Sequence, residues 1–390
     1  MAIDLQTLRR ADIVVVGSGC FGATVAERAA TQLGRKVCVL EKRPQIGGNC
    51  HSELCRDTGI ECHTYGTHIF HTSCRNTWEY INKFTKFTDY RHHVMTTHRD
   101  AVYSMPINLG TICAFFGRRL TPEQARALIA AQVAAEKFET PRNFEEKAIS
   151  LIGRPLYEAF IEGYTRKQWQ VDPRELPSTI ISRLPVRYTF NSRYFSDRFE
   201  GLPEHGYSEI FRRMLDHPNI DVHTGVDWFD LGYAPSPAQL LVYTGAIDRY
   251  FDYCYGELGW RTIDFQREVH AVPDFQGVSV MNYADADVPF TRIHEFRHLH
   301  PERAYGEDNT VIFKEFSRLA RRSDEPYYPI DTRADQETYA RYRARAEALP
   351  NVVMGGRLGR YHYLDMHQAI AAALKISATK LPSFFSSLTL

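Results

Sequence analysis

The amino-terminal segment contains the sequence Asp12-Ile-Val-Val-Val-Gly17-Ser-Gly19-Cys20-Phe21-Gly22, and the prediction of the fold rests on it. The apolar run before Gly17 predicts a buried parallel strand, and the alanine-rich sequence over 22–33 predicts a helix. Glycines at these spacings permit a tight turn, close approach of a pyrophosphate to the backbone, and close packing of the helix on the strand. The run at 37–41 predicts the next strand, so the chain begins with a βαβ unit of the dinucleotide-binding type.

Two features at the end of the second predicted strand indicate which dinucleotide binds. Glu41 follows Gly17 by 24 residues, where a carboxylate can accept hydrogen bonds from a ribose diol. The next residues, Lys42-Arg43-Pro-Gln-Ile-Gly47-Gly48-Asn49, resemble the second FAD signature of flavoproteins of the glutathione reductase type. Paired glycines in that signature let the backbone reach the cofactor phosphates, which favours FAD over NAD.

The composition limits the class of protein. A chain of 390 residues is long enough for two or three packed units. Lysine plus arginine equals aspartate plus glutamate at 47 each, so no overall charge attracts nucleic acid or an anionic membrane. No apolar stretch approaches the ~18–20 residues of a membrane span. The eight cysteines include no C-x-x-C pair, and we expect reduced thiols in a soluble cytoplasmic protein.

The remainder of the chain predicts an α/β fold in three units. Thr121, Pro122 and Gln124 form a helix-start signal, and helical spacing continues to about 180. Alternating aromatic and β-branched residues then predict an antiparallel sheet, interrupted near 240–245 by a strand that returns to the first unit. We expect a discontinuous Rossmann-like FAD-binding domain over 10–83, 204–245 and 346–390, a helical substrate- and uridine-binding domain over 106–182, and an antiparallel sheet domain over 84–105, 183–203 and 246–345.

His68 and His71 stand three residues apart in Tyr65-Gly-Thr-His68-Ile69-Phe-His71. Two histidines beside an aromatic residue are compatible with a zinc site. No third ligand is clustered with them in the sequence, so packing or contact with the flavin is the favoured interpretation, and no metal is expected.

Phe160 and Tyr164 are spaced to share one helix face, and Trp169 follows within two turns. Such a stripe usually belongs to a core. The segment from Gly163 to Trp169 also carries cationic and amide groups, however, which a wholly buried face excludes. Stacking of a flat base such as uracil on these rings is the functional alternative.

Several arginines and tyrosines are unremarkable one by one, because an isolated arginine is usually at the surface and a tyrosine usually packs in a sheet. Together, guanidinium forks and phenols are the groups with which a neutral protein holds a diphosphate. The candidates are Arg183, Arg292, Tyr194, Tyr328 and Tyr363 with the neighbouring Asp365.

These motifs, in this order, resemble the bacterial UDP-galactopyranose mutase family across nearly the whole chain. The specific segments are Ser104-Met-Pro-Ile-Asn108-Leu, Gly163-Tyr-Thr-Arg-Lys-Gln-Trp169, Val280-Met-Asn282-Tyr and Gly356-Arg357-Leu-Gly-Arg-Tyr-His-Tyr363-Leu364-Asp365-Met366. The resemblance implies an isomerase that converts UDP-galactopyranose to UDP-galactofuranose for cell-surface glycans, with UDP held during the reaction. It also implies reduced FAD, a covalent adduct of flavin N5 with galactose, an iminium intermediate and no net redox change.

The resemblance assigns roles to individual residues. The catalytic set is Arg183, Arg292 and His71. The substrate-binding set is Phe160, Tyr164, Trp169, Tyr194, Asn282, Tyr328, Tyr363 and Asp365. The cofactor-binding set is Gly17, Gly19, Cys20, Phe21, Gly22, Glu41, Lys42, Gly47, Gly48, Asn49, His68, Ile69, Arg357, Tyr363, Leu364, Asp365 and Met366.

Three further expectations follow from the resemblance. Phe316 stands where the family is expected to carry a phosphate-contacting tyrosine, so one hydroxyl is missing. Arg183 lies on a proline-interrupted connection over 171–187 that we expect to close on the substrate. We also expect a homodimer. The rival interpretations are an FAD oxidoreductase of the amine-oxidase type and a nucleotide-sugar binding protein without turnover.

Overall fold

A five-stranded parallel sheet forms the base of the cofactor-binding unit, and it confirms the predicted α/β class. The computed structural model describes residues 3–136, 138, 140–181 and 186–388. The strand order is β16-β10-β1-β2-β9, with every neighbouring pair parallel. The strands are β1 (Ile13–Val16), β2 (Val37–Glu41), β9 (Ile220–Thr224), β10 (Leu240–Tyr243) and β16 (Val352–Met354). Three separate parts of the chain therefore build one sheet, and β10 is the returning strand expected near 240–245.

Helices cover both faces of this sheet. The alternate residues Ile13 and Val15 of β1 pack in the core that includes α2 (Cys20–Leu33), α9 (Tyr207–Leu215) and α13 (Met366–Ser387). Val14 points to the opposite core, with α1 (Leu5–Arg10) and the 3-10 turn η5 (Trp228–Leu231). A fourth helix, α3 (Arg75–Ile81), adds to the first face. Among the described helices, α13 included, none is both long and apolar enough for a membrane crossing.

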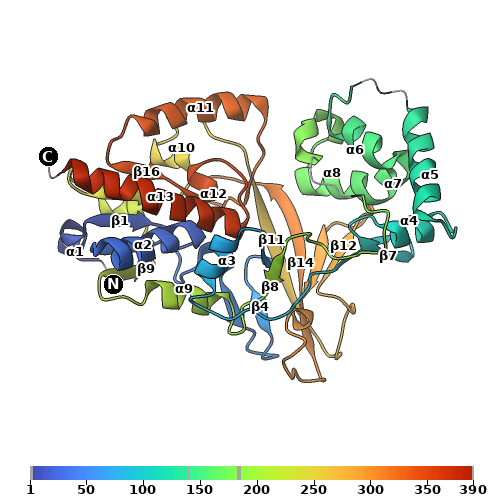
Figure 1. Ribbon diagram of the computed structural model, residues 1–390, viewed down its shortest axis with the longest axis horizontal. Helices are drawn as coiled ribbons and strands as arrows, with labels where there is room; N and C mark the ends of the chain where they lie inside the picture. Colours follow the sequence, from blue (N-terminus) through green and yellow to red (C-terminus); the bar gives the residue numbers. More distant parts are fainter. Residues whose placement is uncertain (1–2, 137, 139, 182–185, 389–390) are drawn as a thin grey trace.

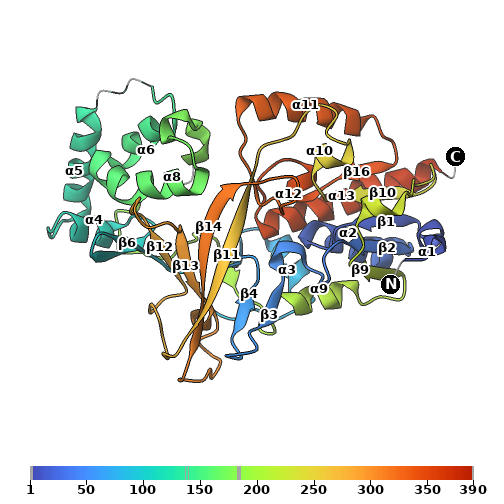
Figure 2. The ribbon, with the colours of Figure 1, turned by 180° about the vertical axis from the view of Figure 1, so that it is seen from behind.

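A seven-stranded sheet forms the second unit, with the order β15-β11-β14-β13-β12-β6-β7. The strands are β6 (Val94–His98), β7 (Ala101–Met105), β11 (Trp260–His270), β12 (Val280–Tyr283), β13 (Arg292–Glu295), β14 (Thr310–Leu319) and β15 (Tyr328–Pro329). All neighbours are antiparallel except β12 and β6, which are parallel. The long pair β11 and β14 lies between the cofactor unit and the helical bundle and runs across the long axis of the molecule (Figures 1 and 2).

Two small antiparallel sheets complete the strands of the described chain. One pairs β3 (Ser52–Leu54) with β4 (Glu61–His63), and the other pairs β5 (Phe70–Thr72) with β8 (Phe199–Gly201). The second brings the segment around His71 against the segment that follows Tyr194. Residues far apart in the sequence thus meet beside the cofactor unit.

The third unit is a helical bundle set apart at the far edge of the large sheet, beyond β7 (Figure 1). Its helices are α4 (Leu109–Phe115), α5 (Pro122–Ala135), α6 (Phe144–Ile152), α7 (Arg154–Tyr157), the π-helical η2 (Glu158–Glu162) and α8 (Gly163–Trp169), followed by the 3-10 turns η3 (Pro173–Glu175) and η4 (Ser178–Ile181). The predicted start of α5 is confirmed, because Thr121 and Gln124 form a capping box. Ile112, Ala125 and Ile152 have no or almost no exposed surface in its core.

One expected boundary differs from the structure. We expected 246–345 to belong to the sheet domain, but α10 (Ile247–Tyr250) and α11 (Arg333–Glu347) pack beside the cofactor unit. Ile247 and Tyr342 share a core with Tyr361, and α11 contacts β16. These helices bury their few apolar residues against the segment after β16. Because this contact joins distant parts of the chain, no local sequence pattern predicts it.

Buried histidines make the stability of this fold sensitive to acid. His63 is 1% and His92 is 5% exposed. Burial lowers the pKa of both, that of His92 to about 3, whereas an unfolded histidine has a pKa of about 6.5. Below pH 6.5 the unfolded chain therefore binds protons that the folded chain does not, and the free energy of unfolding falls as the pH falls from 6.5 towards 4.

We predict that His92→Gln reduces this acid sensitivity. The loss of unfolding free energy between pH 7 and pH 5 should be about 2 kcal/mol smaller in the variant, the contribution of one fully linked histidine. Urea unfolding at the two pH values measures it. His205→Gln is the control, because His205 is exposed, and it should retain the wild-type dependence. Equal dependence in His92→Gln and wild type would contradict the linkage.

Candidate cofactor and substrate site

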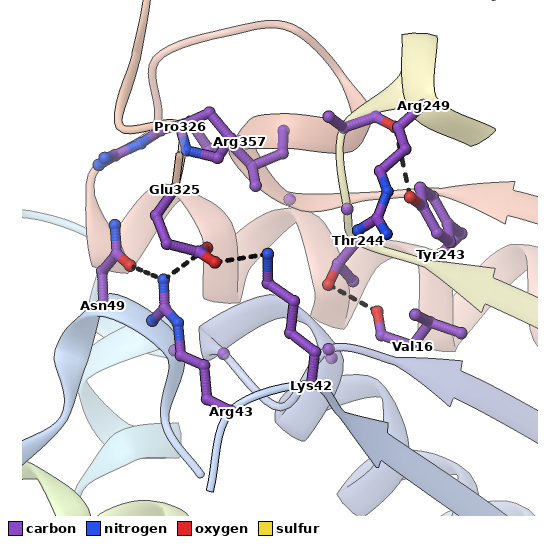
Figure 3. Close-up of a pocket in the computed structure, with 18 of the residues that line it drawn as sticks. Val16, Lys42, Arg43, Asn49, Tyr243, Thr244, Arg249, Glu325, Pro326 and Arg357 are labelled. Carbon is purple, nitrogen blue, oxygen red and sulfur yellow. Dashed lines mark hydrogen bonds and ion pairs between the residues drawn. The ribbon is translucent and has the colours of Figure 1, made fainter. Parts of the chain in front are cut away.

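A cavity of about 290 Å³ opens at the carboxyl ends of the parallel strands. Its lining includes Val16 and Glu41, the last residues of β1 and β2, and Gly17 directly after β1. Thr244, directly after β10, also lines it, and Figure 3 shows Val16 and Thr244 in place. This edge is where ligands bind in open α/β sheets, because the loops after the strands and the helix N-termini converge there. The position fits the dinucleotide expected from the glycine turn.

The glycine turn has a shape that only glycine allows. Gly17 has a φ of +100°, and a Cβ on Gly22 would lie 1.9 Å from the carbonyl oxygen of Gly17. The second glycine segment touches the first, since a Cβ on Gly48 would lie 3.1 Å from Cα of Gly19. The two predicted phosphate-binding loops therefore form one surface, and the amino terminus of α2 lies in it.

Glu41 has two structural partners as well as its place in the cavity lining. Its Oε2 accepts hydrogen bonds from the Ser18 backbone N–H at 3.0 Å and from the Ser18 hydroxyl at 2.7 Å. Its Oε1 accepts from the Arg43 N–H at 3.1 Å. A carboxylate has about four acceptor positions, so Glu41 can hold the turn and still accept one ribose hydroxyl.

An ion cluster borders the cavity beside Asn49 (Figure 3). Lys42 Nζ lies 2.5 Å and Arg43 Nη2 lies 3.0 Å from the two carboxylate oxygens of Glu325. Arg43 also donates to Asn49 Oδ1 at 2.9 Å. Burial alone would lower the pKa of Arg43, but Glu325, Tyr65 and Glu41 together outweigh burial and raise it. The predicted set omitted Arg43 as a ligand, and it omitted Glu325, Thr244 and Arg249, which also line the cavity.

The structure brings most of the predicted cofactor residues to this cavity. The lining contains Gly17, Gly19, Cys20, Phe21, Gly22, Glu41, Lys42, Gly47, Gly48, Asn49, His68, Arg357, Leu364 and Met366. Ile69 is only 6% exposed and packs in the main core instead. Tyr363 and Asp365 are outside this lining, and the ring of Tyr363 lies 5.8 Å from that of Tyr328. Burial lowers the pKa of His68 to about 4, so its ring is neutral at pH 7.

Arg357 connects the cavity to a cluster of tyrosines. It donates to the backbone oxygens of Tyr327 at 3.1 Å and Leu364 at 2.8 Å. Its guanidinium lies 4.6 Å from the ring centroid of Tyr363 and 5.5 Å from that of Tyr328. Burial raises the pKa of both phenols, which keeps them protonated as hydrogen-bond donors.

Arg292 is held by a buried carboxylate that the sequence analysis did not identify. Arg292 Nε lies 3.3 Å from Oε1 of Glu315, and Arg292 also donates to the Tyr164 hydroxyl. Glu315 Oε2 lies 2.9 Å from Nε2 of His294. Burial alone would raise the pKa of Glu315, but Arg292 and His294 outweigh burial and lower it to about 2. Glu315 is therefore a constant negative charge that orients the guanidinium.

Two further substrate candidates lie near this arginine. Asn282 is directly opposite Arg292 in the β12–β13 pair, and its buried Oδ1 has no hydrogen-bond partner among the described residues. Tyr194 has 44% of its surface exposed and is close enough to Arg292 and Tyr328 to contribute to the raised pKa of each. The structure thus gathers Tyr164, Tyr194, Arg292, Tyr328 and Tyr363 from five separate segments.

Phe160, one helical turn before Tyr164, packs in the core of the helical bundle. Its ring is 3% exposed and packs with His98, Tyr103 and Phe115 in the helical core. The residues from Glu158 to Glu162 form a π-helical turn, and Tyr164 lies in α8 directly after it. Phe160 is therefore a core residue, whereas Trp169 stays partly exposed at the end of α8.

The structure describes His71 in detail but not Arg183, which lies outside the described residues. His71 Nδ1 is 2.7 Å from Asp197 Oδ2, and its ring stacks on Phe195 at 3.7 Å. Asp365 caps α13. His71, Asp365 and His367 bring potential ligand atoms within 4.8 Å of one another, and His68 is not part of this group. Phe316, at the predicted departure, packs against Phe290.

Comparison with known proteins agrees with this geometry. The family model described as UDP-galactopyranose mutase matches residues 159–363, and that of an NAD(P)-binding Rossmann-like domain matches residues 15–84. A probable UDP-galactopyranose mutase of Klebsiella pneumoniae is 39% identical over 372 residues, 95% of each chain. The chain belongs to the UDP-galactopyranose mutase family. It is accordingly an isomerase, and this membership implies FAD as its cofactor.

Two other relatives extend the comparison. A dTDP-fucopyranose mutase of Escherichia coli is 36% identical over 374 residues, which are 93% of this chain and 96% of that protein. A crystal structure of reduced UDP-galactopyranose mutase shares the fold with a TM-score of 0.73 at 16% identity, covering 95% of this chain and 96% of the other. The two glycine loops at the cavity fit FAD. A Cβ at Gly17, Gly22 or Gly48 would press on the atoms around these loops and reduce the space for the cofactor.

We predict that Gly48→Ala weakens FAD binding at least tenfold, which corresponds to about 1.4 kcal/mol. The new Cβ would press on the backbone of Gly19. Gly59→Ala is a matched control. Gly59 also has a positive φ, of +68°, but a Cβ added there would meet no other atom within 4 Å. Flavin absorbance per protein after dialysis measures the effect. Equal flavin content in both variants would show that the loop contact does not govern binding.

Proposed function

We propose that this chain interconverts UDP-galactopyranose and UDP-galactofuranose on reduced FAD, without net redox change. The observation that carries the proposal is the position of Arg292, held by the buried Glu315 among tyrosines beside the cofactor cavity. Reduced FAD would supply the nucleophile for the anomeric carbon through its nitrogen N5, which explains why the reduced state is required.

The protein groups act on the diphosphate and on the sugar. Arg292 binds the diphosphate as a bidentate fork and retains UDP while the sugar ring opens and recloses. Tyr194, Tyr328 and Tyr363 donate hydrogen bonds to the same region. Arg183, outside the described residues, is proposed as the second cation, carried by a connection that closes on the substrate. Tyr164 and Trp169 border the uridine end. No group is required to remove a proton as an obligatory general base.

His71 and the cavity residues position the reacting partners. Asp197 orients the His71 ring, because its Oδ2 lies 2.7 Å from Nδ1 of His71. Potential ligand atoms of Asp365 and His367 lie within 4.8 Å of a His71 ring nitrogen. Because burial keeps His68 neutral, no positive charge from it opposes the electron-rich cofactor. We further propose that the protein is a cytoplasmic homodimer that supplies galactofuranose for cell-surface glycans.

A second candidate substrate is dTDP-fucopyranose. The Escherichia coli dTDP-fucopyranose mutase is nearly as similar to this chain as the Klebsiella pneumoniae protein, at 36% against 39% identity. The reaction is of the same kind, so the site described above suits both sugars. The family model for UDP-galactopyranose mutase favours the UDP-sugar.

The decisive experiment compares both substrates on dithionite-reduced and oxidised protein. We expect chromatography to show conversion of UDP-galactofuranose to UDP-galactopyranose with the reduced protein alone, and slower conversion of the dTDP-fucose pair. Preference for dTDP-fucofuranose would reverse the substrate assignment. No conversion, with steady hydrogen peroxide release on addition of amines, would support the amine-oxidase interpretation. Bound flavin and bound UDP-sugar without turnover would support a binding protein.

We predict that Glu315→Gln lowers kcat/KM about 100-fold, the order of effect of losing one preorganised electrostatic group. The neutral amide no longer holds the Arg292 guanidinium or balances its charge. Glu302→Gln is the control, because Glu302 also pairs with a histidine, His300, at 2.8 Å but is largely exposed. It should stay within about twofold of wild type. A similar loss in both variants would indicate a general effect on folding.

A further inference from the structure

Two cysteines from separate loops meet at the cofactor cavity. Cys20 is the first residue of α2, and Cys50 ends the 3-10 turn η1 (Gly48–Cys50). Their Sγ atoms are 3.5 Å apart, and both residues line the cavity. Both thiols are free. No step of the proposed reaction uses them.

The contact follows from the two glycine loops. The approach of Gly48 to Gly19 brings the next residues of each loop together. Gly47 and Gly48 have φ values of +97° and +57°, so the second loop turns back towards the start of α2. A disulfide has an S–S length of about 2.05 Å, so a closing movement of roughly 1.5 Å, divided between two side chains and two loops, joins these sulfurs.

We propose that Cys20 and Cys50 are a redox-active pair, which a peroxide converts to a disulfide that locks the two phosphate-binding loops together around FAD. The lock rests on the proposed binding of FAD in this cavity. The disulfide itself depends only on the positions of the two sulfurs. Its effect is to slow exchange of the cofactor, because the loops on both sides of the phosphates can no longer separate.

The oxidation balances with hydrogen peroxide as the oxidant. Cys20 is the more exposed of the two and reacts first. Its sulfur attacks one peroxide oxygen, the O–O bond breaks, and a sulfenic acid and one water form. Cys50 then attacks the Cys20 sulfur, the S–S bond forms, and the sulfenic hydroxyl leaves as a second water with the Cys50 proton. Two thiols lose two electrons and two protons in total, and one peroxide becomes two waters.

The surroundings of Cys50 suit the resolving role. The contact with Cys20, together with burial, raises the pKa of the Cys50 thiol well above its usual value. Cys50 therefore remains protonated and unreactive towards bulk oxidant until the sulfenic acid forms beside it. Cys38, Cys55 and Cys62 are also buried, whereas Cys74 and Cys254 are exposed. The exposed pair provides an internal standard for oxidation.

The first test maps thiols after peroxide treatment of the purified full-length protein, with and without FAD. Alkylation without reductant and mass spectrometry should show a Cys20–Cys50 crosslinked peptide, two hydrogens lighter than the sum of its parts. In Cys50→Ser, dimedone should trap a sulfenic acid on Cys20. If Cys20 and Cys50 both remain alkylatable after Cys74 and Cys254 are oxidised, the disulfide is disproved. Cys74→Ser should leave the crosslink unchanged.

The second test measures release of FAD by its fluorescence after dilution. Oxidised protein should release FAD at least tenfold more slowly than reduced protein, and dithiothreitol should restore the rate. Cys50→Ser should show no effect of peroxide. Unchanged release from fully crosslinked protein would overturn the lock. A chain that binds no FAD would instead disprove the proposed cofactor, and the crosslink map of the apoprotein distinguishes that failure from the absence of a disulfide.

Discussion

Contact between the two glycine loops at the carboxyl ends of β1 and β2 is the constraint on which the rest of the site depends. The backbone of Gly19 lies against that of Gly48, and any side chain at Gly48 would force them apart. Glu41 holds the first loop through Ser18, and the cluster of Lys42, Arg43 and Glu325 ties the second loop to the segment before β15. The cofactor cradle is therefore built from hydrogen bonds and ion pairs around a contact that only glycine allows.

The buried ion pair of Glu315 and Arg292 holds the proposed substrate region in place, as the loop contact holds the cofactor cavity. β13 and β14 lie side by side, and Thr291 and His294 complete the partners of the carboxylate. A buried carboxylate is costly unless it is paired and hydrogen-bonded, and here every partner keeps Glu315 ionised. The guanidinium is fixed before any substrate arrives, which reduces the reorganisation that binding a diphosphate would otherwise require.

The cysteine pair makes the same loop contact sensitive to oxidation. Cys20 and Cys50 are adjacent to the residues that make the cradle, so oxidation acts where the cofactor is held rather than at the sugar. This arrangement separates control of cofactor exchange from the residues that act on the diphosphate. The cysteines line the cofactor cavity, whereas Arg292 and the tyrosines around it are not part of that lining.

Local sequence was sufficient for the βαβ unit, the FAD signature and the capping box of α5, because each depends on residues within about 35 positions of one another. It was also sufficient to nominate Arg292, Tyr164 and Tyr363 through the family resemblance. Only the tertiary structure revealed Glu315 behind Arg292, Asp365 and His367 beside His71, and Cys50 beside Cys20. It also revealed the π-helical turn at Glu158–Glu162 and the burial of Phe160 in the helical core. The physical reason is that periodicity and turn chemistry report the neighbours of a residue along the chain, whereas the charge and reactivity of a buried side chain depend on partners that only packing brings together.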